Sequence, residues 1–162
     1  MPHLFDALCD LAELALGCKT CKTRSSGPLQ AAAALGIERI GGLVHLSSGN
    51  EALEVGVLAT PSDCRALAER LLGKPACGAF PDSIVRGAMC ELAYLLAGGV
   101  RRRMAGSSVG AISVGQPSFL AGDVAPKVGW QVQTTEVELD TITATLVCVR
   151  RDANAAPIAT PF

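Results

Sequence analysis

One stretch of the chain, residues 81–98, limits the possible folds more than any other. Pro81 and Asp82 are typical of a first helical turn, and Gly98-Gly99 is typical of a helix end. Between these two signals, apolar residues recur at helical spacing and form one wide stripe. The stripe consists of Ile84, Val85, Ala88, Met89, Leu92, Leu95 and Leu96. We therefore expect a central helix that buries this stripe against a sheet.

The opposite face of the expected helix has an unusual composition. Glu91 and Tyr94 are three residues apart in the sequence, so their side chains lie next to each other on a helix. Small residues surround them, whereas a solvated face usually carries Lys, Glu and Gln. The whole face consists of Arg86, Gly87, Cys90, Glu91, Tyr94 and Gly98. This pattern favours a docking surface, and the alternative is an ordinary solvated pair.

Composition limits which class of protein this chain can belong to. The chain has 162 residues, which suits one domain over residues 1–150 and a flexible tail over 151–162. Hydrophobic residues make up 49% and charged residues 18%, and the net charge of −1 argues against binding nucleic acid through bulk charge. We identify no apolar run of transmembrane length and no secretory leader, so no membrane partner is expected. Seven cysteines are an odd number, which favours reduced thiols in a cytoplasmic protein.

The part of the chain before the central helix predicts one helix, one strand and a hairpin. Residues 4–16 repeat apolar groups at helical spacing, and residues 18–24 alternate loosely as in a short strand. Residues 25–38 are compatible with a short helix or a loop. Residues 39–59 read as a hairpin around the turn Ser48-Gly49-Asn50, in which Leu53, Val55, Val57 and Ala59 share one face and Glu54 lies on the other.

Three further segments complete the expected fold. A helix is expected from Thr60, its N-cap, to Gly73, with Pro61 as its first residue. After the central helix we expect Arg101 to Arg103 followed by a Gly/Ser loop, then a strand from Val109 to Val114 that runs to Pro117, a loop over 118–127, and two strands starting at Val128 and Thr141. Strands pair with near neighbours in this order, which predicts an α+β fold with helices packed on one side of a largely antiparallel sheet.

Other motifs give weaker signals. Cys18 and Cys21 form one C-x-x-C, but zinc needs about four ligands and a redox motif stands at a helix start after a strand. His3 and His45 are isolated, so structural or solvated roles are expected. The run Arg101 to Arg103 fits a solvated helix end, and an acidic partner is the alternative. We expect no metal site and no phosphate-binding loop in this chain.

Four features together resemble the CheX/CheC chemotaxis phosphatases, with the CheX type closest. The resemblance covers roughly residues 4–150. It depends on the hairpin with Gly41 to Leu46 and Leu53 to Ala59, the helix end Arg70-Leu71-Leu72-Gly73, the central ELAYLLAGGVRRRMA, and the strand Ile112 to Pro117. The family pattern is Asp or Ser, three residues, Glu, two residues, Asn, twenty-two residues, Pro. Glu91 and Pro117 match this pattern, whereas Gly87 and Tyr94 stand at the Asp/Ser and Asn positions.

The resemblance implies a role toward CheY-like response regulators. In this family the Glu pairs with a lysine of the receiver and the Asn orients the water that attacks the phosphoaspartate. The Mg²⁺ is held by the receiver, so no cofactor is expected in this chain. The catalytic candidates are thus Glu91 and, at the Asn position, Tyr94, and the binding candidates are Arg86, Gly87, Cys90 and Pro117.

Three functions remain open from the sequence. The first is a domain that docks a phosphorylated receiver with weak or lost phosphatase activity, because Tyr94 replaces the Asn. The alternatives are an active phosphatase and a structural module like the flagellar switch proteins. The resemblance also implies a homodimer that pairs through sheet edges, and the Thr-rich closing hairpin is the expected edge.

Overall fold

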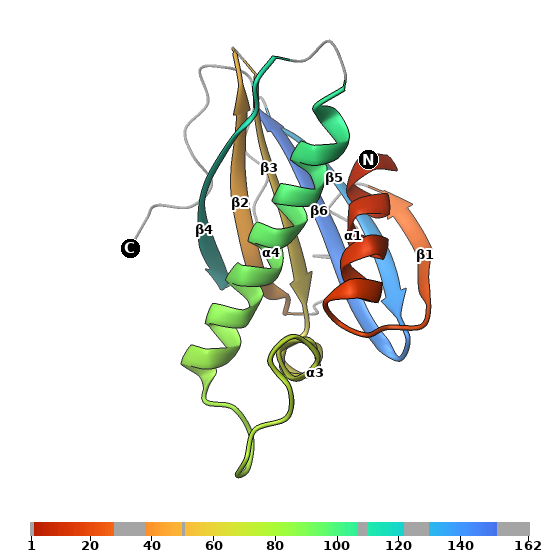
Figure 1. Cartoon of the computed structure of the whole chain (residues 1–162), viewed down its shortest axis with the longest axis vertical. Coiled ribbons are helices and arrows are strands. Elements are labelled where there is room, and N and C mark those ends of the chain that lie inside the picture. The colour runs from red at the N-terminus through yellow and green to blue at the C-terminus, as the bar shows by residue number, and fades with distance from the viewer. Residues whose placement is uncertain (1, 28–37, 50, 107–109, 122–129, 152–162) are drawn as a thin grey trace.

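The computed structural model describes residues 2–27, 38–49, 51–106, 110–121 and 130–151. Within these ranges it contains three helices and six strands in one α+β unit (Figure 1). The helices are α1 (Pro2–Leu14), α3 (Pro61–Leu72) and α4 (Asp82–Met104). The strands are β1 (Cys21–Gly27), β2 (Ile40–Ser48), β3 (Glu51–Ala59), β4 (Ser113–Ala121), β5 (Trp130–Leu139) and β6 (Ile142–Arg151).

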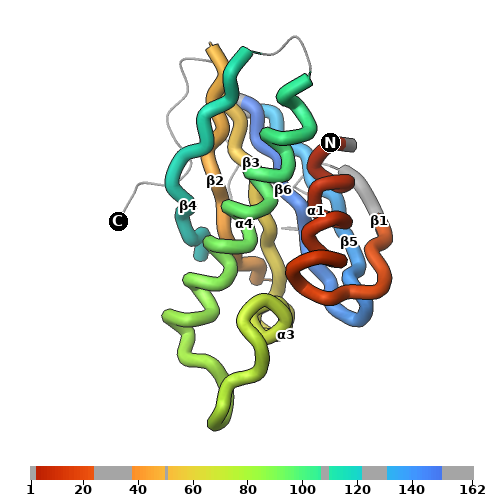
Figure 2. The backbone as a smooth tube through the Cα atoms, in the orientation of Figure 1, coloured from red at the N-terminus to blue at the C-terminus, as the bar shows by residue number. Residues whose placement is uncertain are grey.

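The six strands form one antiparallel sheet in the order β1-β5-β6-β3-β2-β4. All three helices lie on the same side of this sheet, with α4 over β3, β2 and β4 and α1 beside α4 (Figure 2). The expected fold class is therefore confirmed, as is the element order. The predictions for residues 28–37 and for the tail after residue 151 lie outside the described residues.

Local sequence signals explain the elements that precede α4. Thr60 is the N-cap of α3, where its hydroxyl accepts a hydrogen bond of 3.2 Å from the backbone N–H of Asp63. Gly73 ends the helix with a positive φ of 84°. The hairpin β2–β3 pairs Ile40 with Ala59 and Ser48 with Glu51, as its alternating pattern predicts.

The core lies between α4 and the sheet. Val55, Val57 and Ala59 point into it from β3, and Ile142, Ala144 and Leu146 point into it from β6. Gly42 on β2 brings the helix close to the sheet: a Cβ added at this residue would lie 2.3 Å from the carbonyl oxygen of Met89. This glycine is therefore a packing requirement, because any side chain here would push α4 off the sheet.

The structure corrects the expected end of α4. The helix continues through Gly98-Gly99 to Met104, so Arg101 to Arg103 occupy its last turn instead of following its end. Gly99 is a contact point: a Cβ at this position would lie 3.1 Å from the Cβ of Ala7 on α1. The glycine therefore allows two helices to approach closely, and sequence alone cannot distinguish that use from a helix stop.

The apolar stripe of α4 is also partly corrected. Ile84 is 43% exposed, and Leu95 is only half-buried, whereas Ala93, Ala97 and Val100 are buried. Ile84 belongs to the first turn and lies roughly 140° around the helix axis from Met89. The buried face of α4 therefore contains fewer large side chains and more small ones than predicted, which lets α4 lie close to the sheet.

Two predictions about the later strands were wrong. Strand β4 begins at Ser113 and continues to Ala121, so residues 118–121 are strand and not loop. Pro117 is accommodated because β4 is an edge strand, next to a bulge in its pairing with β2. The closing hairpin β5–β6 is internal, since β1 pairs with β5 and β3 pairs with β6. The sheet edges are β1 and β4, and the Thr-rich hairpin is not an edge.

Helix α4 also differs from the expectation about membrane-length segments. Its 23 residues are long and apolar enough to cross a membrane by length and composition. In the folded chain, however, one face of α4 packs against the sheet and contributes residues such as Met89, Leu92 and Leu96 to the core. Core helices of water-soluble proteins meet the same criterion, so this feature is weak evidence for a membrane span.

Asp140 in the β5–β6 turn joins three parts of the fold. Its Oδ1 accepts hydrogen bonds of 2.9 Å from the backbone N–H groups of Lys19 and Thr20, and Arg70 of α3 lies 3.2 Å from Oδ2. Asp140 has a positive φ of 54°, which Asp tolerates better than most residues. The backbone hydrogen bond from Thr20, followed by that from Lys19 and the charge of Arg70, lowers the pKa of Asp140 from its ordinary value of 3.8.

We expect the Asp140 network to make stability pH-dependent in acid. Because the folded pKa is below the unfolded one, the carboxylate stabilises the fold above about pH 4, and this contribution is lost as pH falls further. The urea midpoint of Asp140→Asn should therefore lie below that of wild type at pH 7 and approach it at pH 3. An equal gap at both pH values would show that Asp140 does not act through its charge.

Candidate functional site

The exposed face of α4 contains the residues that the sequence singled out. Gly87, Glu91 and Tyr94 are exposed, and Gly98 is half-buried on the same line along the helix. The opposite side of the helix holds Met89 and its buried neighbours, so core packing fixes which way this face points. We call the surface formed by Gly87, Glu91, Tyr94 and Gly98 the α4 face.

Glycines flank the two polar groups of the α4 face. A Cβ added at Gly87 would meet no atom within 4 Å, so this glycine leaves open surface and is not required for packing. Tyr94 is 44% exposed, which is high for an aromatic side chain. Glu91 is the sole carboxylate of α4 after Asp82. The face therefore offers one carboxylate and one exposed phenol flanked by glycines.

Strand β4 borders the α4 face. Arg86 extends from the helix toward this strand, and its guanidinium carbon lies 5.1 Å from the centre of the Phe119 ring. This cation–π contact joins α4 to β4. Pro117 lies half-buried on the same strand, opposite Val44 of β2. The structure thus places Arg86 and Pro117 at one border of the face, away from its centre.

Cys90 contributes little chemistry to the site. It is half-buried, and burial raises the pKa of its thiol above the ordinary value. A thiol of raised pKa stays protonated at neutral pH and is a poor nucleophile. Within the described ranges, no group of three His, Cys, Asp or Glu side chains could hold a metal ion. The site can position charge and hydrogen bonds, but it lacks a paired nucleophile and base.

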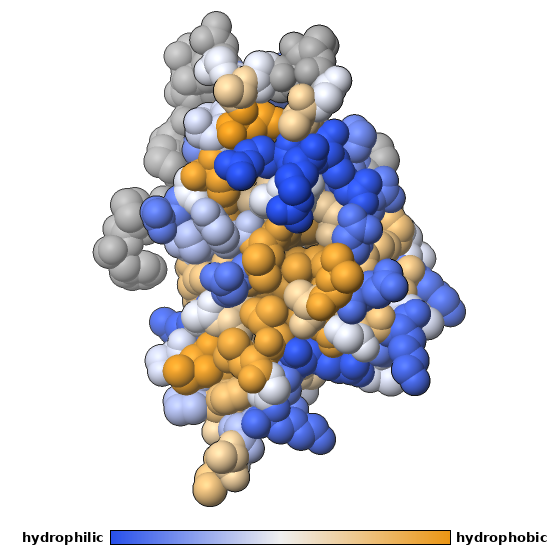
Figure 3. Space-filling model, in the orientation of Figure 1, coloured by the Kyte–Doolittle hydropathy of each residue, from blue (hydrophilic) through white to orange (hydrophobic). Residues whose placement is uncertain are grey.

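Sequence reasoning missed an apolar groove between α1 and α4. Leu11 and Leu14 line it from α1, and Leu95 and Gly99 line it from α4, with Arg102 at one end. Leu14 is 85% exposed, and Figure 3 shows an apolar area in this region below a strongly polar one. Sequence spacing predicts a helix end at Gly99, so it gives no sign of a groove that includes this residue. Its lining continues the α4 face toward α1.

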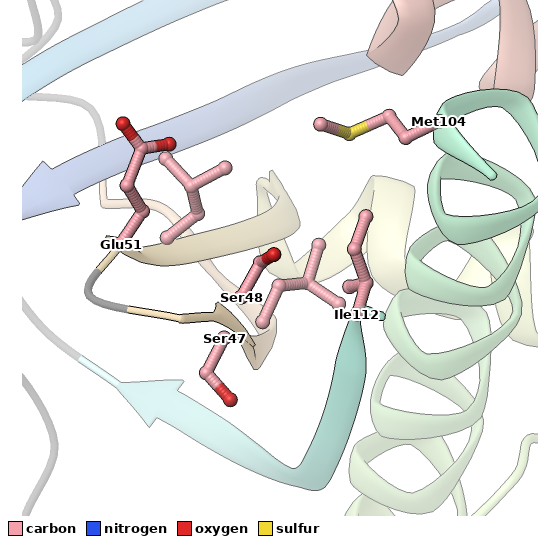
Figure 4. Close-up of a pocket in the computed structure, with 7 residues that line it drawn as sticks. Ser47, Ser48, Glu51, Met104 and Ile112 are labelled. Atoms are coloured by element: carbon pink, nitrogen blue, oxygen red, sulfur yellow. The ribbon is translucent and has the colours of Figure 1, made fainter. Parts of the chain in front are cut away.

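A second pocket lies where the hairpin β2–β3 meets the end of α4. Met104 and Ile112 line its apolar side, and Ser47, Ser48 and Glu51 lie at its rim (Figure 4). The polar groups already bond within the protein: Ser48 donates to the carbonyl of Gly110 over 3.3 Å, and Glu51 pairs with Arg150 at 2.8 Å. We therefore assign no ligand to this pocket.

Comparison with known proteins identifies the fold. No protein-family model matches the chain, and no curated protein matches its sequence. Solved structures of CheX and CheC-like chemotaxis proteins match over 93% of this chain, with TM-scores from 0.65 to 0.72.

Three of these structures show the range of similarity. CheX from Vibrio vulnificus is 12% identical, with a TM-score of 0.72 over 93% of this chain and 95% of that chain. CheX in a complex with CheY, BeF3 and Mg²⁺ from Borrelia burgdorferi is 13% identical, with a TM-score of 0.67 over 93% of this chain and 96% of that one. The FliM middle domain from Vibrio alginolyticus is 10% identical, with a TM-score of 0.56 over 94% and 88%. The chain therefore has the fold of the CheX and CheC-like chemotaxis proteins.

Proposed function

We propose that this protein docks a phosphorylated CheY-like receiver domain on its α4 face in chemotaxis or two-component signalling. The observation that carries the proposal is the exposure of Glu91 and Tyr94 side by side on one helix face, with glycines on either side. The same fold occurs in a Borrelia burgdorferi CheX that was solved with CheY. Glu91 would pair with a lysine of the receiver, and Gly87 and Gly98 would let the partner approach the helix.

The proposal includes weak or absent phosphatase activity. The family Asn is short and rigid, and its amide both donates and accepts hydrogen bonds, which suits the positioning of a water. Tyr94 carries its hydroxyl at the end of a ring, several ångströms farther from the helix. It would meet the partner's surface before it could orient a water at the phosphoaspartate. Mg²⁺ would be held by the receiver, so this chain needs no cofactor, and a cytoplasmic location would follow from such a partner.

Two other functions remain as alternatives. An active phosphatase would retain Glu91 and use the Tyr94 hydroxyl in place of the amide. A structural role like that of the flagellar switch is less favoured, because the FliM middle domain has a TM-score of 0.56 against 0.72 for the Vibrio vulnificus CheX. Receiver binding that depends on phosphorylation would distinguish the docking and phosphatase functions from the structural role.

A blocking substitution on the α4 face tests the docking proposal. Gly87→Arg should leave the fold intact, because the position is open and arginine favours a helix more than glycine does. It should nevertheless weaken binding to a receiver loaded with acetyl phosphate and Mg²⁺ by at least about tenfold, as measured by calorimetry across a panel of CheY-like receivers.

Matched variants complete the binding experiment. Glu91→Ala should weaken binding, whereas Glu51→Ala removes an exposed carboxylate outside the face and should leave it unchanged. Unphosphorylated receivers should bind less tightly than phosphorylated ones. If Gly87→Arg binds as well as wild type, the partner uses another surface and the docking proposal is wrong.

We further propose that the protein is a homodimer that pairs through a sheet edge. Of the two edges, β1 carries the exposed Lys22, which is typical of an edge protected against pairing. Strand β4 carries no charged residue from Ser113 to Ala121, and its one interruption is Pro117, so the segments on either side of this proline are the favoured pairing edge. Light scattering at micromolar concentration should give twice the monomer mass of 16.6 kDa. A mass equal to the monomer at every concentration would exclude the dimer.

A further inference from the structure

Two cysteines that are twelve residues apart in the sequence contact each other beside α1. The Sγ atoms of Cys9 on α1 and Cys21 at the start of β1 are 2.7 Å apart. Both residues are half-buried and both are free thiols. The sequence motif pairs Cys21 with Cys18, but the direct contact of Cys21 is with Cys9. This pair plays no part in the proposed docking function.

Each of the two thiols is attached to a regular backbone element. Cys9 lies within α1, and Cys21 begins β1, where it pairs with Leu139 of β5. The connection between them is fixed to the sheet, because Lys19 and Thr20 donate to Asp140. A disulfide bond is about 2.05 Å long. Bond formation therefore requires the two sulfur atoms to approach each other by less than 1 Å.

We propose that Cys9 and Cys21 form a reversible disulfide that ties α1 to the edge strand β1. The oxidant is a small-molecule disulfide such as oxidised glutathione. The Cys9 thiolate attacks one sulfur of the oxidant and releases one reduced glutathione, which leaves a mixed disulfide at Cys9. The thiolate of Cys21 then attacks the Cys9 sulfur and releases the second. Two thiol protons and two electrons leave the protein, and one oxidised glutathione becomes two reduced ones.

The order of attack follows from the surroundings of the two thiols. Burial, followed by the hydrogen bond with Cys9, raises the pKa of Cys21 to about 12. Cys21 is therefore protonated while Cys9 is reduced, and the contribution of Cys9 to this pKa disappears once Cys9 carries glutathione, so Cys21 attacks second. Cys18 is buried in the core, and burial with the nearby charge of Asp140 raises the pKa of its thiol too. The direct sulfur contact of Cys21 is with Cys9, so Cys18 takes no part in this bond.

The disulfide would stabilise the N-terminal part of the fold. It closes a ring between residues 9 and 21, which restricts the unfolded chain while the folded chain changes little. For a ring of this length in a chain of this size, we expect the melting temperature to rise by about 5–10 °C. The bond would also fix α1, which forms one wall of the groove beside the α4 face.

The test uses the full-length protein, purified reduced and then incubated with oxidised glutathione. Peptide mapping of the non-reduced protein should show Cys9 linked to Cys21, with a loss of two hydrogens from the protein mass. Dithiothreitol should reverse both the link and the rise in melting temperature. Cys18→Ser should still form the link, and so should Cys77→Ser, which removes an exposed thiol. Cys9→Ser should lose both the link and the stabilisation.

Each alternative outcome is decisive. A map that shows Cys18 linked to Cys21, or only glutathione adducts on separate cysteines, would overturn the proposal. So would a Cys9–Cys21 link that leaves the melting temperature unchanged or lowers it. The map of the wild-type protein does not depend on any variant folding, and the result is independent of whether a receiver binds to the α4 face.

Discussion

Leu92→Ala is expected to lower the free energy of unfolding by about 2–5 kcal/mol. Leu92 is 1% exposed and lies at the middle of α4, in the core between the helix and the sheet. The substitution removes buried apolar surface and leaves a cavity, because Gly42 already holds the helix backbone close to β2 and limits its further approach. Urea unfolding at pH 7, followed by circular dichroism, measures the loss.

Ile84→Ala is the matched control for this prediction. It removes an aliphatic side chain from the same helix, but Ile84 is 43% exposed, so the expected loss is below about 1 kcal/mol. A loss below half a kilocalorie for Leu92→Ala would contradict the described packing. Equal losses for the two variants would show that helix propensity, and not burial, determines the effect.

The contrast between these two residues shows what the sequence could predict. Periodicity identified the helix, and the burial of Met89, Leu92 and Leu96 was predicted correctly. Periodicity could not place Ile84, because burial in a first turn depends on how far the sheet extends beneath it. It also could not interpret Gly99, whose role is the close contact with Ala7 of a distant helix.

The order of the strands in the sheet was harder to predict from the sequence than the presence of each strand. Both hairpins were predicted, but β1 pairs with β5 across more than a hundred residues, and this long-range pairing makes β5–β6 internal. Local alternation has no information about such pairing. For the same reason, the contact between Cys9 and Cys21 could not be inferred from the C-x-x-C spacing.

The position of the candidate site could largely be predicted from the sequence, because the site lies on one helix. The α4 face follows directly from the spacing of Gly87, Glu91 and Tyr94, and the structure exposes all three. The groove beside it depends on the packing of α1 against α4, so only the folded chain reveals it. What the face does remains a prediction, and position 94 decides between docking and catalysis.

Tyr94→Asn is expected to raise the rate of receiver dephosphorylation by on the order of a hundredfold over wild type. The substitution places a short amide beside Glu91, at the spacing that the resemblance assigns to the water-positioning residue. Tyr94 is exposed, so the change should cost little stability. The rate is measured as phosphate release from a receiver that was loaded with acetyl phosphate and freed of excess reagent.

Two further variants identify the origin of this gain. Glu91→Ala in the Tyr94→Asn background should abolish it, because the partner then loses the charge that fixes its orientation. Tyr94→Ala removes the ring without supplying an amide and should not reproduce the gain. If Tyr94→Ala is as active as Tyr94→Asn, the tyrosine merely blocks the site and no side chain at position 94 orients the water.

The most direct test of the docking account follows one phosphorylated receiver in the presence of the wild-type protein. Fluorescence anisotropy reports complex formation, and phosphate release from the same sample reports the lifetime of the phosphoaspartate. The account predicts saturable binding that Gly87→Arg weakens, with a phosphoryl lifetime close to that of the receiver alone. Rapid dephosphorylation by wild type, or the absence of binding to any CheY-like receiver, would contradict it.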